Sequence, residues 1–464
     1  MEKLRQTLRD SKTARWTALG IVAFTMLCGY FLTDAMAPLK GMLEEKLSWS
    51  SSEYGFFTSA YGWFNVFLFF LIIGGIIADK MGVRFSGLMA ASIMVVGTAL
   101  KYWAVSTHSL DGQVWHILWF DMKAQVFMAA LGFAIFGVGV EVAGITVSKI
   151  IVKWFKGKEM ALAMGLEMAM ARLGTGLAIG TSLPFARAFD QVSAPILLAL
   201  VLLCIGLISF FIYTFMDKKL DAEDAAFAKH HEIVDTEESF KLSDIWKIFT
   251  NKGWWYIAIL CVLFYSAVFP FLKYAQDLMV NKFGVAEELA GAIPMMLPFG
   301  TIILTPFFGN LYDRKGKGAS IMLLGAAILI FVHAMFAIPF LNQVPVAIFL
   351  TIVLGIGFSL VPSAMWPSVP KIIPEKQLGT AYSMIFWVQN WGLMGVPALI
   401  GWVLDKYCIT GQVIKNGISV NTYNYTIPML IFMSLGILAI VFALLLKAED
   451  KKMGYGLELP NIKK

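Results

Sequence analysis

The sequence has little charge and few of the residues that catalysis or metal binding needs. Charged residues make up 15% of its 464 positions, against about 25% in an ordinary soluble protein. Its four cysteines are scattered and include no CxxC pair, so neither a disulfide framework nor a zinc site is indicated. No HExxH, GxSxG or phosphate-binding GxxxxGK motif occurs. The sequence therefore predicts neither an enzyme nor an ATPase, and no cofactor or metal.

The excess of positive charge is small and is spread along the chain. Lys and Arg number 37 and Asp and Glu 31, a net charge of +6. The excess lies in short loops and forms no single basic face, which argues against nucleic-acid binding and indicates topology signals.

What the sequence has instead is long apolar runs. Hydrophobic residues make up 58% of the chain, its mean hydropathy is +0.73, and many runs approach the roughly 20 residues that span a bilayer. We predict an all-α integral membrane protein with twelve spans, near residues 16–39, 56–78, 86–107, 124–149, 160–186, 193–216, 254–280, 286–310, 319–340, 344–370, 377–404 and 424–447.

One polar stretch, residues 217–252, divides these spans into six and six. We expect an N-terminal six-helix bundle over 1–216, a cytoplasmic linker over 217–252, and a C-terminal bundle with a cytoplasmic tail over 253–464. Lys and Arg gather before the first span and after the second, fourth, eighth, tenth and last. Because cytoplasmic loops carry the positive excess, both termini are predicted to be cytoplasmic.

Two loops in equivalent places repeat one pattern. Gly75-x-x-x-Asp79-Lys80-x-Gly82-x-Arg84 follows the second predicted span, and Gly309-x-x-x-Asp313-Arg314-x-Gly316 follows the eighth. The pattern resembles the signature loop of the major facilitator superfamily, whose two six-helix halves are expected to rock about a central site. The alternative is a plain topogenic loop. The resemblance implies charge contacts that form in one conformation and break in the other, with the gating candidates Gly75, Asp79, Arg84, Gly309, Asp313 and Arg314.

Ionisable residues inside predicted spans point to a cavity, because each costs at least about 2.5–3.5 kcal/mol at mid-membrane. Glu141 lies in the fourth span and Arg172 in the fifth. They could neutralise each other as a structural pair. We favour the alternative that they hold opposite ends of a zwitterion, with Arg172 on a carboxylate and Glu141 on an ammonium.

Other charged positions leave more than one interpretation open. Asp34, in the first span, could be a proton-linked carboxylate, a ligand contact or a packing acceptor for Tyr61. Lys273 and Asp277, four positions apart near the outer end of the seventh span, are expected to form a surface pair. Glu167 is roughly 140° around its helix from the arginine five positions later, and need not face the same cavity.

The second half offers uncharged polar and aromatic groups. Such a lining would make a pocket that tolerates varied side chains, although ordinary helix packing is an alternative for each residue. The candidates are Tyr265, Phe269, Trp366, Tyr382, Gln389 and Asn390.

Blocks in both halves resemble the lysosomal dipeptide transporter family of this superfamily and its bacterial homologues. They include Tyr30-Phe31-x-x-Asp34, Tyr61-x-Trp63-x-Asn65, Met170-Ala171-Arg172-x-Gly174, Ala267-Val268-Phe269-Pro270-Phe271, Trp366-Pro367 and Gln389-Asn390. The resemblance implies alternating-access transport of dipeptides, by uniport or proton coupling, with Glu141 and Arg172 on the peptide ends. Tyr30, Tyr61 and Asn65 become further candidate contacts. The expected partners are a small zwitterion and the lipid bilayer.

The chain also departs from that family. The acidic dileucine sorting signal is missing from its basic N-terminus, so we expect a bacterial cytoplasmic membrane rather than a lysosome. Glu167 stands where the relatives have an amide, and the ExxER motif of proton-coupled peptide transporters is missing from the first span. Two alternatives stay open: a transporter of another small organic anion or amino acid, and a non-transporting receptor or assembly partner with this fold.

Overall fold

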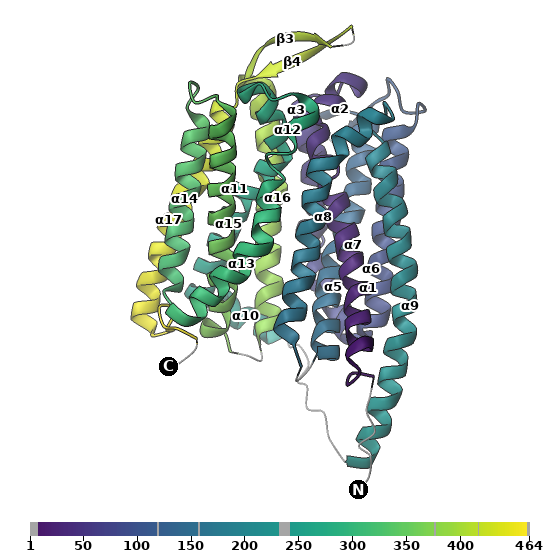
Figure 1. The fold of residues 1–464 in the computed structure, drawn as a ribbon, viewed down its shortest axis with the longest axis vertical. Coiled ribbons are helices and arrows are strands. Elements are labelled where there is room, and N and C mark those ends of the chain that lie inside the picture. Colours follow the sequence, from purple (N-terminus) through teal and green to yellow (C-terminus); the bar gives the residue numbers. More distant parts are fainter. Residues whose placement is uncertain are drawn as a thin grey trace.

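The computed structural model describes residues 8–117, 120–155, 158–231, 242–374, 377–415 and 417–461. Long helices stand side by side in two groups, and both chain ends lie at the same end of the bundle (Figure 1). The elements are α1 (Lys12–Asp34), η1 (Ala37–Leu39), α2 (Lys40–Leu47), α3 (Ser51–Ser59), η2 (Ala60–Gly62), α4 (Trp63–Phe67), α5 (Phe70–Lys80), α6 (Gly82–Ser106), β1 (Val114–Ile117), β2 (Phe120–Lys123), α7 (Ala124–Phe155), α8 (Met160–Ala188), α9 (Ala194–His231), α10 (Leu242–Phe249), α11 (Lys252–Phe283), α12 (Glu287–Ala290), α13 (Met296–Lys315), α14 (Gly318–Ala337), α15 (Val344–Ile372), α16 (Leu378–Tyr407), β3 (Ile409–Lys415), β4 (Ile418–Tyr423) and α17 (Thr426–Met453).

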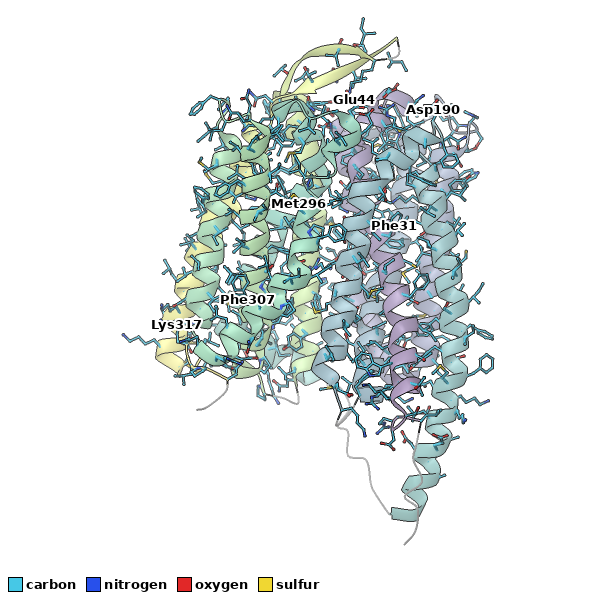
Figure 2. All side chains as sticks on the ribbon, in the orientation of Figure 1. Phe31, Glu44, Asp190, Met296, Phe307 and Lys317 are labelled. Carbon is cyan, nitrogen blue, oxygen red and sulfur yellow. The ribbon has the colours of Figure 1, made fainter. Side chains whose placement is uncertain are left out.

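The helices match the predicted spans in position. Among the described residues, ten helices are long and apolar enough to cross a membrane, and the bent pair Ser51–Phe67 and Phe70–Lys80 would be an eleventh crossing. The 20-residue helix α13 lies at the predicted eighth span. Figure 2 shows Glu44 and Asp190 at one end of the bundle and Lys317 at the end where the termini lie. We call the first the outer end and the second the cytoplasmic end.

The second predicted span is not one straight helix. Its two parts meet at 57°, and Phe69 between them has a φ of 55°, in the left-handed region. Bulky residues rarely adopt this conformation. The continuous apolar run 56–78 gave no sign of the break, because hydropathy does not report backbone conformation.

The predicted linker begins as helix. α9 continues through His231 and projects beyond its neighbours at the cytoplasmic end (Figure 1). Asp217, at the start of this extension, is buried and accepts hydrogen bonds from Lys153 Nζ at 2.8 Å and Tyr213 Oη at 2.9 Å. Residues 232–241 lie outside the described ranges, and the division into two domains at this linker stays a prediction.

Two hairpins at the ends of helices were not predicted. β1 pairs with β2, and β3 pairs with β4, both antiparallel. The β3–β4 hairpin leads from α16 to α17 and extends past the outer end of the bundle (Figure 1). Most residues of β3 are exposed, so the hairpin lacks the alternating apolar pattern that identifies a half-buried strand.

Glycines bring the N-terminal helices close together around the central cavity. A Cβ at Gly137 of α7 would lie 2.2 Å from the Tyr61 carbonyl oxygen, and one at Gly174 of α8 would lie 2.3 Å from the Leu27 carbonyl oxygen. Such distances exclude any side chain. Glycine at these two positions therefore lets η2 pack on α7 and α1 pack on α8.

Candidate functional site

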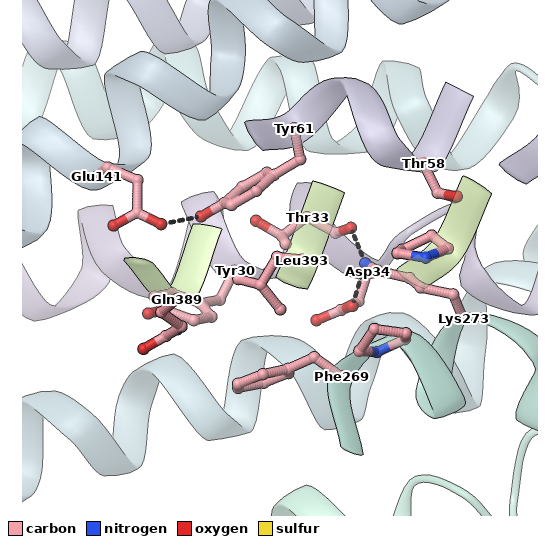
Figure 3. A pocket seen from close by; sticks show the side chains of 12 residues that line it. Tyr30, Thr33, Asp34, Thr58, Tyr61, Glu141, Phe269, Lys273, Gln389 and Leu393 are labelled. Atoms are coloured by element: carbon pink, nitrogen blue, oxygen red, sulfur yellow. Dashed lines mark hydrogen bonds and ion pairs between the residues drawn. The ribbon is translucent and has the colours of Figure 1, made fainter. Parts of the chain in front are cut away.

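A cavity lies between the two groups of helices. The space that its atoms leave free, open solvent included, is about 590 Å³. Both halves contribute to its wall, as Figure 3 shows. The lining residues are Tyr30, Thr33, Asp34, Thr58, Tyr61, Glu141, Phe269, Pro270, Lys273, Gln389, Leu393 and Pro397.

Glu141, on α7, faces this cavity with its carboxylate held by a tyrosine. Tyr61 Oη donates a hydrogen bond of 2.7 Å to Glu141 Oε1 (Figure 3). The close approach of Tyr61 to Gly137, one helical turn before Glu141, sets this geometry. Within the described ranges Glu141 has no ion-pair partner. Its neighbours Tyr61 and Asn390 are neutral, so its negative charge is left for a cationic ligand group.

Arg172, on α8, reaches across to the C-terminal half. Its guanidinium carbon lies 5.3 Å from the Phe269 ring centroid and 5.1 Å from that of Phe358. Both are cation–π distances, and Phe269 lines the cavity. In the part of the chain that the structure describes, Arg172 makes no ion pair, so the direct Glu141–Arg172 pair does not form. A guanidinium carries five N–H donors, and aromatic faces leave them for an anion.

Charges converge on Tyr30 of α1. Its hydroxyl interacts electrostatically with Arg172, Glu141, Glu167 and Asp34. Glu167 therefore adds its charge to the surroundings of Tyr30, although it is not among the residues that line the cavity. Helical spacing gives the angles of side chains around one helix axis, but it does not say which other helices lie next to each side chain.

Asp34 of α1 is almost fully buried and has two partners. Its carboxylate accepts from Lys273 Nζ at 2.6 Å and from Thr175 Oγ1 at 2.8 Å. The expected surface pair of Lys273 with Asp277 is wrong, because Lys273 reaches α1 instead. Asp277 pairs with Lys40 Nζ at 3.0 Å. Spacing along one helix could not reveal partners that come from the other half of the chain.

The aromatic candidates of the C-terminal half form one cluster behind the cavity wall. Trp366 Nε1 donates to Tyr265 Oη at 3.1 Å, and Tyr382 Oη donates to the Trp366 carbonyl at 3.1 Å. The Tyr265 ring stacks on Phe269 with centroids 5.4 Å apart. Of these four, Phe269 lines the cavity and the others support it. Gln389 of α16 also lines the cavity.

The two predicted amide contacts hold helices. Asn65 is fully buried and donates to the Gly137 carbonyl at 3.3 Å. Asn390 is fully buried and donates to the Phe386 carbonyl at 3.0 Å. Neither residue is in the cavity lining, although the Asn390 side chain also lies next to the Glu141 carboxylate.

Lys101 of α6 was not identified as a candidate from the sequence. Its side chain is fully buried, and Nζ has no hydrogen-bond partner among the described residues. Nζ lies over the rings of Phe57 and Phe133, 5.0 and 4.3 Å from their centroids. A lysine inside the predicted span 86–107 was the signal that could have identified it.

Ion pairs join the two halves at the outer end. Lys40 of α2 pairs with Asp277 of α11, and Arg187 Nη2 of α8 lies 2.7 Å from Glu287 Oε2 of α12. Asp405 of α16 accepts from the backbone N–H groups that begin α3, at 3.0 and 2.6 Å. These contacts close the outer end.

Two tyrosines of the C-terminal half add to these contacts, Tyr423 across the halves and Tyr425 within its own half. Tyr423 Oη donates to Glu44 of α2, and Tyr425 Oη donates to Asp277. Burial raises the pKa of both hydroxyls. Each tyrosine therefore stays protonated and able to donate at neutral pH.

The charged gating candidates at the cytoplasmic end whose partners the structure describes pair within their own half. Asp79 pairs with Lys149 of α7, and Arg84 Nη1 lies 2.9 Å from Asp221 of α9. Asp313 accepts from Asn461 Nδ2 at 2.7 Å, and Arg314 is exposed. Of the cytoplasmic ion pairs with both partners described, each joins helices of one half.

The two glycines of the repeated pattern differ in their surroundings. A Cβ at Gly75 would lie 3.8 Å from Ser383 Oγ of α16, and one at Gly309 would have open space within 4 Å. Gly75 thus marks a place where α5 of the N-terminal half approaches α16.

Comparisons with known proteins agree with this architecture. A sequence model described as Major Facilitator Superfamily matches residues 19–397 and 274–458. The chain is 28% identical to the lysosomal dipeptide transporter MFSD1 of Mus musculus, over 84% of this chain and 80% of that protein. It is 29% identical to MFSD1 of Danio rerio, over 84% and 81% of the two chains.

Solved structures at low identity share the fold. A D-xylose–proton symporter is 14% identical, with a TM-score of 0.67 over 92% of this chain and 97% of that chain. A bacterial homologue of the human drug peptide transporters PepT1 and PepT2 is 14% identical, with a TM-score of 0.60 over 95% and 99%.

Proposed function

The chain belongs to the major facilitator superfamily and is a multi-pass membrane transporter, and we propose that it carries dipeptides by alternating access. The named relatives, which are called dipeptide transporters, support this substrate. The observation that carries the proposal is a carboxylate and a guanidinium on neighbouring helices, with no ion-pair partner among the described residues, beside a cavity between the halves.

Glu141 and Arg172 have the charges that the two ends of a dipeptide require. The peptide ammonium binds Glu141, whose other oxygen is already oriented by Tyr61. The peptide carboxylate binds the Arg172 guanidinium, which presents a planar fork of donors. The rings of Phe269 and Phe358 position that guanidinium without using its N–H groups.

The C-terminal wall is aromatic and uncharged near Arg172, and this supports broad side-chain tolerance. Phe269 and the cluster of Tyr265, Trp366 and Tyr382 behind it offer apolar area and few fixed polar groups. Recognition then depends on the peptide ends, and the side chains contribute mainly apolar contact.

Transport requires that the outer end open and the cytoplasmic end close. Opening separates Lys40 from Asp277 and Arg187 from Glu287. Closing would bring together the cytoplasmic loops that carry Asp79, Arg84, Asp313 and their neighbours, and the gating role of these residues stays a prediction. The site stays near the membrane midplane while the halves rock around it.

Which cellular membrane contains the transporter is a separate prediction. Both termini lie at one end of the bundle (Figure 1), which the positive-charge rule makes cytoplasmic. The bacterial cytoplasmic membrane stays our prediction, with the lysosomal membrane of the relatives as its alternative.

Uptake into liposomes that contain the purified protein tests the proposal. A radiolabelled dipeptide is followed with and without a pH gradient, against unlabelled dipeptides, N-acetylated dipeptides, C-amidated dipeptides and free amino acids. We expect free dipeptides to compete and end-blocked ones to fail. Glu141→Gln and Arg172→Ala should each lower uptake about 10- to 100-fold, because a hydrogen bond to a charged group contributes about 1.5–3 kcal/mol.

Glu288→Gln is the matched control, because it makes the same chemical change at an exposed position of α12. It should transport like the unmodified protein. Competition by free amino acids alone, or loss with Arg172→Ala but not Glu141→Gln, would instead support a carrier of amino acids or organic anions. No uptake of any of these solutes would reject the dipeptide proposal.

A further inference from the structure

An ammonium group from one half of the molecule is bound in a site built by the other half. Lys273 Nζ of α11 donates to Asp34 Oδ1 and to the Thr33 carbonyl of α1, each at 2.6 Å (Figure 3). The other Asp34 oxygen accepts from Thr175 Oγ1 of α8 at 2.8 Å. We call Thr33, Asp34 and Thr175 the Asp34 socket. All its residues belong to the N-terminal half.

The socket has the chemistry of an ammonium site. Its two acceptors are a carboxylate oxygen and a carbonyl oxygen, and Thr175 fixes the carboxylate from the other side. Thr33, Asp34 and Lys273 line the same cavity as Glu141. Asp34 is 3% exposed, and a buried carboxylate without a cation carries a large free-energy penalty. While it is buried, the socket therefore needs a cation or a proton, and in this structure the Lys273 ammonium is the cation.

Rocking must empty the socket. α1 and α11 lie in different halves, and opening the outer end moves them apart. Lys273 then leaves Asp34, and the cavity that contains the socket becomes accessible from outside. A substrate that enters with a primary ammonium supplies the missing cation.

We propose that the Asp34 socket is the first binding site for the substrate ammonium, and that Lys273 is a tethered competitor that displaces it when the outer end closes. The displaced ammonium moves within the cavity to Glu141. The ligand class is a primary ammonium, and the proposal rests on the proposed function for the identity of the substrate that carries it. It goes beyond the Glu141–Arg172 site by giving the ammonium two successive positions.

A simple ion-pair closure would make different predictions. If Asp34 and Lys273 only hold the outer end shut, the exchanged variant Asp34→Lys with Lys273→Asp restores the pair and normal transport. If the socket also binds substrate, the exchange restores closure and leaves ammonium recognition lost.

The first experiment measures binding in a Glu141→Gln background, which removes the second ammonium position. The ratio of affinities for a free dipeptide and its N-acetylated form is compared among variants that pass a thermal-stability check. We expect Lys273→Met to bind the free dipeptide about ten-fold more tightly, because the competitor is gone. Lys273→Arg should behave like lysine, and Asp34→Asn should lose the preference for the free amine. An unchanged ratio in Lys273→Met overturns the proposal, even if Asp34→Asn does not fold.

The second experiment does not depend on dipeptides. Spin labels at Phe189 and Phe340, exposed outer positions of the two halves, report the opening of the outer end, in a background where the partly exposed Cys204 is replaced by Ser. Excess ethylammonium should increase the open population, and ethanol should not. The effect should vanish in Asp34→Asn. No response to ethylammonium, or the same response in Asp34→Asn, overturns the socket.

The two experiments separate the two proposals. If dipeptides bind to no variant but ethylammonium opens the outer end through Asp34, the socket stands and the dipeptide assignment fails. If dipeptides bind with an unchanged amine preference and ethylammonium has no effect, the socket fails and the dipeptide assignment stands.

Discussion

The outer and cytoplasmic ends of the bundle are both rich in ion pairs. They differ in whether the pairs join the two halves or lie within one half. At the outer end, Lys40–Asp277 and Arg187–Glu287 join one half to the other. At the cytoplasmic end, Lys153–Asp217 and Arg84–Asp221 join helices within the N-terminal half. In the alternating-access transport that we propose, the first kind breaks when the outer end opens, and the second kind persists. We therefore propose that the same chemistry serves as a gate at one end and as a brace at the other.

The largest expected effect comes from removing the buried partner in the outer gate. Asp277→Ala takes the nearer carboxylate from the Lys40 ammonium, which is 2% exposed and keeps only the more distant Glu44, at 3.9 Å, among the described residues. Removing one partner of a buried pair costs about 3–5 kcal/mol. We expect a lower melting temperature and a shift of the Phe189–Phe340 spin-label distance toward the open outer end. A lower melting temperature without the shift would show that this pair does not gate.

A slightly smaller effect is expected from the cytoplasmic brace. Asp217→Asn removes a buried charge that Lys153, Tyr213 and Trp154 all contact. The free energy of unfolding should fall by about 2–3 kcal/mol, within the range for a lost hydrogen bond to a charged group. The outer spin-label distance should not change. A change in that distance would contradict the division into gate and brace.

A double-mutant cycle measures the half-buried contact between Arg187 and Glu287. Arg187→Gln, Glu287→Gln and the double variant should give a coupling energy of about 1–2 kcal/mol in the equilibrium between closed and open outer ends. The coupling stays below that of a fully buried pair because both side chains are partly exposed. Arg187 Nη2 also lies 2.6 Å from Glu45 Oε2 of α2, and a coupling near zero would mean that Glu45 holds Arg187 without Glu287.

The smallest effect is expected for an exposed outer pair within one half. Lys46 and Asp190 are 2.7 Å apart, but the Asp190 side chain is 73% exposed. Such surface pairs contribute about 0–1 kcal/mol. Lys46→Gln should therefore leave melting temperature, spin-label distance and uptake nearly unchanged. A large effect on outer opening would show that an ion pair at the outer end acts as a gate even when both of its residues belong to the same half.

Predictions from the sequence succeeded where the signal was local. Apolar runs of membrane-spanning length predicted the helices, and the repeated loop predicted the superfamily. Glu141 was identified by its charge inside a span, and the structure places it in the cavity wall. Arg172 was identified in the same way and contacts that wall through Phe269.

Predictions failed where a residue's partner comes from far along the chain. Lys273 was assigned to Asp277 by helical spacing, but its partner is Asp34, 239 positions away. Asn65 was expected at the substrate, and the structure places it against the α7 backbone. The β3–β4 hairpin was missed for a different reason: its strands pair locally, but most residues of β3 are exposed and carry no alternating pattern.

The sequence by itself determined the helices and the charged residues inside them, and it predicted their orientation in the membrane. These follow from the free-energy cost of apolar surface in water and of charge in lipid, which each segment incurs on its own. The tertiary structure decided which charges pair, because pairing depends on how the two halves sit against each other. That relation changes during transport. The sequence can place Lys273 and Asp34 in the membrane, but only the arrangement of the two halves puts the Lys273 ammonium in the Asp34 socket.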